Sequence, residues 1–233
     1  MQPPVIPKIA LDYLDNAHKL DELKTPFKAA WIIKGLNLII VKKHYLRNFQ
    51  EPFFERLKEI SWKLYDDGHD VTRTLDYRLR ESETSEDAVY LLQELAPGYQ
   101  LKEFIFDLSN PLRKQFAEEP LSLYEKYISD HMAIDGAFGD VDDNFTNLFY
   151  SSGKITFIDI EPQRIRPHKR SPKYAADNFN RELYRDDPIE NQILEKMRQA
   201  ALNLGKIRVF FSKLKKKQQT LYASAVIPRS IET

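Results

Sequence analysis

The tripeptide Ala96-Pro97-Gly98 divides the chain into two parts with different patterns. Before it, short β-rich runs at 29–34, 36–43, 71–75 and 88–92 surround one helix that opens at Pro52. After it, apolar residues recur at helical spacing over 101–108, 111–117, 121–133, 187–204 and 207–217. Proline and glycine together end regular structure. We therefore predict an α+β fold of two lobes, with a small β-rich N-lobe (1–95) and a mostly helical C-lobe (96–233).

Composition excludes several classes of protein. The 233 residues contain no cysteine, so disulfides, zinc-thiolate sites and thiol nucleophiles are absent. Thirty-five basic and thirty-five acidic side chains cancel, and no general attraction to nucleic acid is expected. The first residues lack the basic and apolar pattern of a signal peptide, and the longest apolar runs, such as 38–41, are too short to cross a bilayer. We expect a cytoplasmic protein.

Two acids and an amide lie in the segment 139–161. Asp142 precedes Asn147 by five residues, and Asp159 follows Asn147 by twelve. Short strands near 148–150 and 155–158 enclose the turn Ser151-Ser152-Gly153, which would return the second acid to the amide. Carboxylate and amide oxygens suit a magnesium ion that also binds phosphate. The spacing therefore indicates a candidate catalytic centre.

Two simpler interpretations of this segment compete. Residues 140–144 resemble the start of an EF-hand calcium loop, but that motif needs glycine at its sixth position and glutamate at its twelfth, where Phe145 and Ser151 stand. Aspartate and asparagine also favour ordinary turns. A turn alone does not account for the following strands and Asp159, so the phosphate-site hypothesis is preferred.

Taken in order with three earlier motifs, this segment resembles the protein-kinase-like superfamily, nearest to its aminoglycoside-phosphotransferase and lipopolysaccharide-sugar-kinase branches. Residues 39–43 are similar to the strand whose inward lysine holds the nucleotide phosphates, and we assign that role to Lys42. Either Glu55 or Glu59, one helical turn apart, would hold the lysine. Glu59 is preferred because it lies nine residues before Gly68, as in the phosphotransferases. Alternatively, Lys42 is an ordinary lysine at a strand end, and the glutamates form a solvated helix face.

The resemblance implies further roles. Residues 89–98 look like the hinge strand and its Pro-Gly turn, so backbone groups near Glu94 and Leu95 would bind an adenine edge. Asp142 would accept or orient the substrate hydroxyl, while Asn147 and Asp159 would bind Mg²⁺. Asp140, which follows a glycine as the catalytic acid often does, remains an alternative to Asp142.

The chain also departs from the family. Gly35 is the only glycine before Gly68, so no glycine-rich phosphate loop exists; Lys24, Thr25 and Lys28 stand near its place. Asp159-Ile160-Glu161 replaces the usual Asp-Phe-Gly, and no activation segment follows. These departures point to a minimal or small-molecule kinase, or to an inactive pseudokinase.

The predicted function is phosphoryl transfer from ATP with Mg²⁺ to a hydroxyl of a sugar, another small molecule or a protein. A pseudokinase or nucleotide-binding module is the alternative, and an unrelated interaction protein whose acids cap turns is a third. Residues 206–217 combine basic and aromatic side chains, which suits peripheral contact with an anionic membrane. The alternative is that this segment packs on the domain and solvates its lysines.

Overall fold

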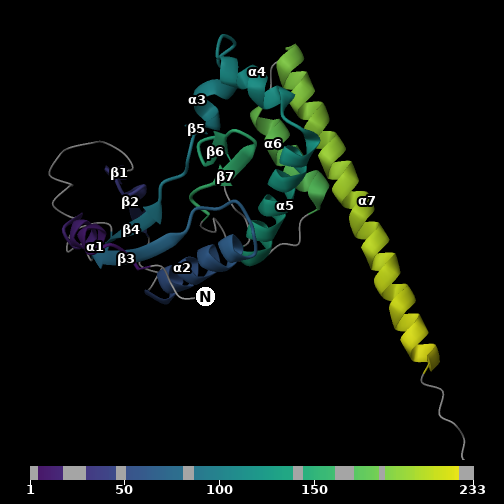
Figure 1. Cartoon of the computed structure of the whole chain (residues 1–233), viewed down its shortest axis with the longest axis horizontal. Coiled ribbons are helices and arrows are strands. Elements are labelled where there is room, and N and C mark those ends of the chain that lie inside the picture. Colours follow the sequence, from purple (N-terminus) through teal and green to yellow (C-terminus); the bar gives the residue numbers. More distant parts are fainter. Residues whose placement is uncertain are drawn as a thin grey trace, which may run out of the picture.

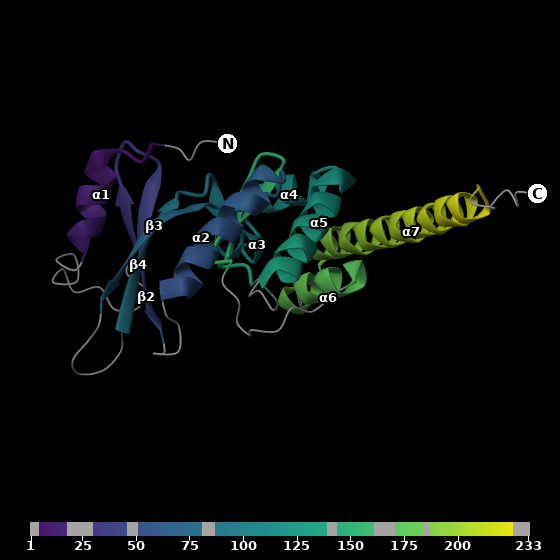
Figure 2. The ribbon, with the colours of Figure 1, turned by 90° about the horizontal axis from the view of Figure 1, so that it is seen from below.

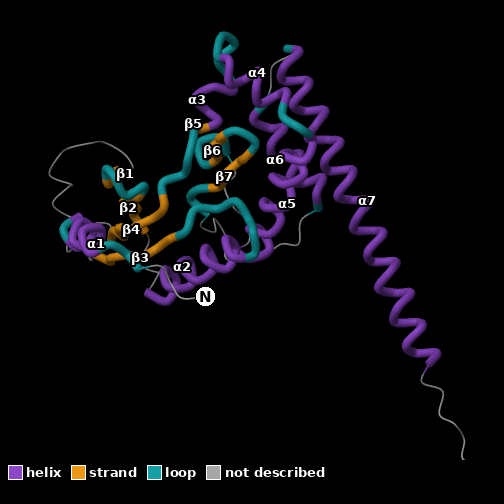
Figure 3. The backbone as a smooth tube through the Cα atoms, viewed as in Figure 1, coloured by secondary structure: helices purple, strands orange, loops and turns teal. Residues whose placement is uncertain are grey.

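A computed structural model of the chain describes residues 5–17, 30–45, 51–80, 87–138, 144–160, 171–183 and 187–225. The N-lobe comprises α1 (Lys8–Asp15), β1 (Ala30–Ile33), β2 (Leu38–Tyr45), α2 (Glu51–Asp66), β3 (Thr74–Arg80) and β4 (Asp87–Glu94). Its four strands form an antiparallel sheet in the order β1-β2-β4-β3. The sheet and the helical part of the chain lie beside each other (Figures 1 and 3).

Side-chain alternation along β4 assigns one helix to each face of this sheet. Ala88, Tyr90 and Leu92 are buried with residues of α1, whereas Val89 and Leu91 belong to the cluster that contains α2 residues. Alternate residues of a strand point to opposite faces, so a strand covered on both sides is apolar throughout. This explains the unbroken apolar run of β4.

The C-lobe comprises β5 (Tyr99–Gln100), α3 (Leu101–Ile105), α4 (Pro111–Glu118), α5 (Leu121–Phe138), β6 (Leu148–Ser151), β7 (Lys154–Phe157), α6 (Pro172–Glu182) and α7 (Pro188–Ala225). Helix α5 packs against α6 and α7, and the short sheet β5-β6-β7 lies at its side (Figure 2). This is the predicted α+β fold, with a small β-rich lobe and a mostly helical lobe. Within the described residues, no helix has both the length and the apolar character needed to cross a membrane.

Several element boundaries differ from those expected. Strand β3 runs over 74–80 rather than 71–75, because Val71 instead forms a bridge with Phe157 of β7. Ahead of the first β-rich run expected at 29–34, residues 8–15 form the eight-residue helix α1. Helix α6 was not expected; the Ser171 hydroxyl caps it by accepting the Tyr174 N–H at 3.3 Å.

The two helices expected at 187–204 and 207–217 are one continuous helix, α7, of 38 residues. Gly205 lies inside it. A glycine in a helix interior costs only about 1 kcal/mol relative to alanine, which the neighbouring turns outweigh. Glycine therefore did not mark a helix end here.

A buried arginine fixes the start of α7. Arg113 of α4 is 2% exposed; its guanidinium donates to Asp187 and, at 3.1 Å, to the buried Glu190. Asp187 also accepts the N–H groups of Ile189 and Glu190. Burial alone would raise the pKa of Asp187, but the Glu190 N–H and the Arg113 guanidinium outweigh it and lower that pKa.

We predict that Arg113→Met strongly destabilises the protein. Glu190 would keep its buried position without a counter-charge, and removing one partner of a buried ion pair costs about 3–5 kcal/mol. The free energy of unfolding, measured with urea, checks this. Lys114→Met is the control, because the neighbouring Lys114 is 72% exposed and such changes alter stability by about 0.5 kcal/mol at most. Equal stabilities of the two variants would contradict the assigned role of Arg113.

Candidate functional site

The site is organised around an ion pair between the lobes. The ammonium of Lys43 on β2 donates to Oδ1 of Asp159, just beyond β7. Their side chains are 12% and 22% exposed, respectively. Partial burial strengthens the attraction between the two charges relative to a pair on the surface. A basic and an acidic group from different lobes therefore meet at one point.

The structure brings Lys43, and not Lys42, to Asp159. Lys42 pairs with Tyr90 in the sheet register, and its ammonium lies 5.9 Å from the centre of the Tyr90 ring. Tyr90 belongs to the face covered by α1. Adjacent residues of a strand point to opposite faces, so only one of the two lysines can face the helical lobe. Of the two adjacent lysines, Lys43 is therefore the one that meets Asp159, and the phosphate-holding role expected of Lys42 stays a prediction.

Asp159 has an unusual backbone. Its φ of 55° lies in the left-handed region, and Asn37 is the only other described non-glycine residue with a positive φ. This conformation costs an ordinary residue about 1–2 kcal/mol. Such strain is concentrated at functional sites, where the surrounding structure maintains it. It turns the chain sharply at the residue that meets Lys43.

Asn147 lies opposite the residue before Asp159. The Ile158 N–H donates to the Asn147 carbonyl at 2.9 Å, which extends the β6–β7 pairing by one step. Asn147 is 5% exposed, and its Oδ1 accepts from the Thr146 hydroxyl at 3.4 Å. The hairpin therefore brings the Asn147 backbone to Ile158, the residue directly before Asp159.

Asp142, the candidate for orienting a hydroxyl, lies outside the described residues, as does its alternative Asp140. The described chain resumes at Asn144, whose Oδ1 accepts the Thr146 N–H at 2.9 Å. Gln100 Nε2 donates to the Thr146 carbonyl at 2.5 Å, which joins this segment to β5. The roles of Asp142 and Asp140 stay predictions.

The donor set at Asp159 and Asn147 fits a magnesium ion. Both supply oxygen atoms, the ligands that Mg²⁺ prefers. No group of three or more His, Cys, Asp or Glu that could hold a metal occurs in the described parts of the chain. A magnesium ion coordinated mainly by phosphate and water needs only one or two protein carboxylates. The two residues therefore suit a metal that arrives with a nucleotide.

At the hinge, the N–H groups of Glu94 and Leu95 both donate to carbonyls within the chain. The Glu94 N–H donates to the Arg73 carbonyl at 3.1 Å, and the Leu95 N–H donates to the Asn37 carbonyl at 2.9 Å. The Arg73 guanidinium binds the Glu94 carboxylate and lies between the Trp62 and Tyr65 rings, at 4.5 and 4.1 Å. The N–H groups of Glu94 and Leu95 are thus already used within the chain, and binding of an adenine edge by other backbone groups near them stays a prediction.

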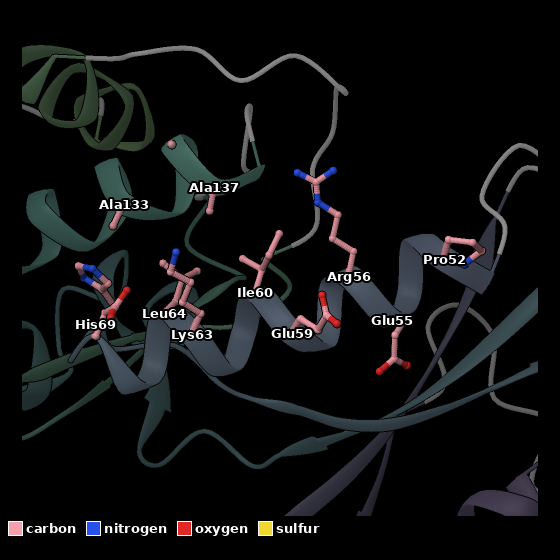
Figure 4. Close-up of a pocket in the computed structure, with 12 residues that line it drawn as sticks. Pro52, Glu55, Arg56, Glu59, Ile60, Lys63, Leu64, His69, Ala133 and Ala137 are labelled. Atoms are coloured by element: carbon pink, nitrogen blue, oxygen red, sulfur yellow. The ribbon is translucent and has the colours of Figure 1, made fainter. Parts of the chain in front are cut away.

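Glu55 and Glu59 both lie on the exposed side of α2. They line a pocket of about 780 Å³ between α2 and the end of α5 (Figure 4), whose lining contains neither Lys43 nor Asp159. Both glutamates are exposed, and Glu55 accepts from Lys58 at 3.4 Å. Leu57 faces the core, and residues two positions apart on a helix lie nearly opposite each other. Helical geometry therefore turns Glu59 away from the sheet.

Asp130 of α5 is a residue that the sequence did not single out. It is fully buried. Its carboxylate accepts hydrogen bonds from His69 Nδ1 at 2.8 Å, from the Asp70 N–H at 3.1 Å and from Lys126 Nζ at 2.6 Å. Next to it, the Phe157 N–H donates to the Asp70 carbonyl at 2.8 Å. These bonds hold the α2–β3 loop on α5 and β7. A lone aspartate in a helix gave no signal of this role.

No protein-family model matches the sequence, and no curated protein matches it either. Among solved structures, the chain is similar to the Drosophila melanogaster PAN3 pseudokinase, with 14% identity and a TM-score of 0.42 over 78% of this chain and 54% of that one. It is also similar to WaaP in complex with acyl carrier protein, with 12% identity and a TM-score of 0.44 over 95% and 100% of the two chains. A third is the MAP kinase LmaMPK10 from Leishmania major, with 18% identity and a TM-score of 0.36 over 82% and 66%. Such distant likenesses say nothing about activity, substrate or partner.

The strain at Asp159 gives a test of the backbone. We predict that Asp159→Gly is more stable than Asp159→Ala by about 1 kcal/mol, because glycine adopts a positive φ without a steric penalty. Thermal unfolding of the two variants measures the difference. At ordinary positions alanine is the more stable of the two, through its effect on the unfolded chain. An alanine variant as stable as the glycine variant would therefore show that residue 159 is not left-handed.

Proposed function

We propose that this chain is a minimal phosphotransferase, which binds ATP with Mg²⁺ between the lobes and transfers its terminal phosphoryl group to a hydroxyl. The supporting observation is the pair of Lys43 and Asp159, with Asn147 beside it. These are the cation, the carboxylate and the amide that phosphoryl transfer requires. The aminoglycoside-phosphotransferase and lipopolysaccharide-sugar-kinase branches remain the nearest resemblance in sequence, so the favoured acceptor is a sugar or another small molecule.

In the proposed reaction, the role of each residue follows from the charge or polarity of its side chain. The Lys43 ammonium would offset the negative charge of the phosphates. Asp159 and Asn147 would hold Mg²⁺ through their side-chain oxygens. Mg²⁺, when bound, neutralises charge that develops on the transferred group. Asp142 would orient the acceptor hydroxyl and accept its proton.

The first test compares the two adjacent lysines. Lys43→Met should weaken binding of ATP with Mg²⁺ about tenfold to a hundredfold, because a hydrogen bond to a charged group contributes about 1.5–3 kcal/mol. Lys42→Met is the matched control, with the same chemical change on the opposite face of β2, and should bind as the wild type does. Isothermal titration calorimetry measures both affinities. A larger loss in the Lys42 variant would return the role to Lys42 and refute this geometry.

A second candidate function is a pseudokinase, an interaction module of the same fold that transfers no phosphoryl group. The hinge favours it, because the N–H groups of Glu94 and Leu95 already have partners. The position of Glu59, away from Lys43, favours it too. In this case the Lys43–Asp159 pair joins the lobes and serves no catalysis.

Turnover separates the two functions. For the phosphotransferase, we predict magnesium-dependent ATP consumption that falls below detection in Asp159→Ala and in Asp142→Ala. Purified protein is assayed for release of ADP with and without a panel of hydroxyl-bearing acceptors. Melting temperatures of the variants control for folding. Wild-type protein that binds no nucleotide under any of these conditions would reject the phosphotransferase and leave the pseudokinase.

A further inference from the structure

The second half of α7 extends beyond the rest of the molecule. Figures 1 and 2 show it projecting away from the helical lobe in two perpendicular views. Its first half is held in the core by Ile193, Met197 and Ala200, which are all fully buried. From there exposure rises, and Ile207 and Val209 are 47% and 54% exposed. Residues 206–225 form a rod of about 30 Å at 1.5 Å per residue.

This projecting part carries charge of one sign only. Between residues 196 and 231 the sequence has nine basic residues and no acidic one. Six of the nine lie within 206–217. Because the whole chain is neutral, the rest of the molecule carries an equal negative charge. Such segregation of charge creates an attraction to an anionic partner at the α7 end alone.

The same segment is amphipathic. At 100° per residue, five of the apolar positions (207, 210, 211, 214 and 221) fall within an arc of about 100°, whereas Val209 lies nearly opposite Ile207. The basic positions lie on both sides of this arc: 206, 213 and 217 flank one edge, and 208 and 215 lie near the other. A narrow apolar arc with lysines at its edges is typical of helices that lie in the interface of a membrane, where the long lysine stems reach the headgroups.

We propose that residues 206–221 of α7 bind the surface of an anionic lipid membrane, independently of any nucleotide site. Charge argues against the main alternatives. A second copy of the chain in parallel would bring like charges together along the whole segment, which is destabilising. Nucleic acid would satisfy the lysines but leave phenylalanine, isoleucine and leucine positions in water. An anionic membrane surface offers both an apolar interior for the apolar arc and charged headgroups for the basic positions at its edges.

The test is flotation of the full chain with vesicles. One set is phosphatidylcholine alone, and in the other about a third of the lipid is phosphatidylglycerol. Wild-type protein should float only with the anionic vesicles, and raising the salt from about 0.1 M to about 0.5 M should release it. Flotation with both sets alike, or with neither, overturns the proposal.

Two variants and a control sharpen the test. The variant Lys213→Gln/Lys215→Gln/Lys216→Gln/Lys217→Gln should lose at least about a hundredfold of affinity, since each basic residue near such a surface contributes about a fivefold gain. The matched control is Lys8→Gln/Lys34→Gln/Lys102→Gln/Lys114→Gln, which removes four exposed lysines from elsewhere and should float as the wild type does. An equal loss in the control would refute a role for α7.

The apolar arc is tested by Phe211→Ser/Leu214→Ser. It should also reduce flotation at least about tenfold, with the helix content checked by circular dichroism. Sedimentation velocity of the wild type tests the remaining alternative, in which a second copy of the chain binds this surface. Concentration-dependent dimerisation that these two serines abolish would assign the arc to a second copy and overturn the membrane proposal.

Discussion

The contact between the α2–β3 loop and β7 is the constraint on which the site depends. Thr72 donates its N–H to the Phe157 carbonyl at 3.0 Å, and Phe157 donates in return to Asp70 at 2.8 Å. Buried Asp130 holds the same loop from α5. These bonds join the α2–β3 loop of the N-lobe to strand β7 of the C-lobe. Asp159 follows Phe157 by only two residues, so the position at which it can meet Lys43 is set by this joint.

The joint also connects the Lys43–Asp159 pair to the hinge. Asp159 lies just beyond the β6–β7 hairpin, where Lys43 donates to it, and Asn147 accepts the Ile158 N–H beside that hairpin. At the hinge, Arg73 follows Thr72 directly, and its bonds to Glu94 continue the same loop. The loop that positions Asp159 thus also accepts the Glu94 N–H of the hinge, through the Arg73 carbonyl.

Much of the fold could be predicted from sequence because the spacing of the apolar residues and the positions of proline and glycine gave clear signals. The hairpin that returns Asp159 to Asn147 followed from two short strands and a Ser-Gly turn. The choice between Lys42 and Lys43 did not follow, because Ile39, Ile40 and Val41 are apolar on both faces of β2 and alternation gave no sign of direction. The structural role of Asp130 could not be predicted either, for a different reason. Its partners His69 and Asp70 come from another lobe, about sixty positions earlier in the chain.

Gly98 in the linker between the lobes has a φ of 90°, and a Cβ atom there would stand 2.1 Å from the carbonyl oxygen of Tyr150. The linker therefore rests directly on the β6 backbone, with no room for a side chain. Any substitution would lift the linker away from the hairpin and tilt one lobe against the other. The approach of Lys43 to Asp159 therefore depends in part on a single absent methyl group.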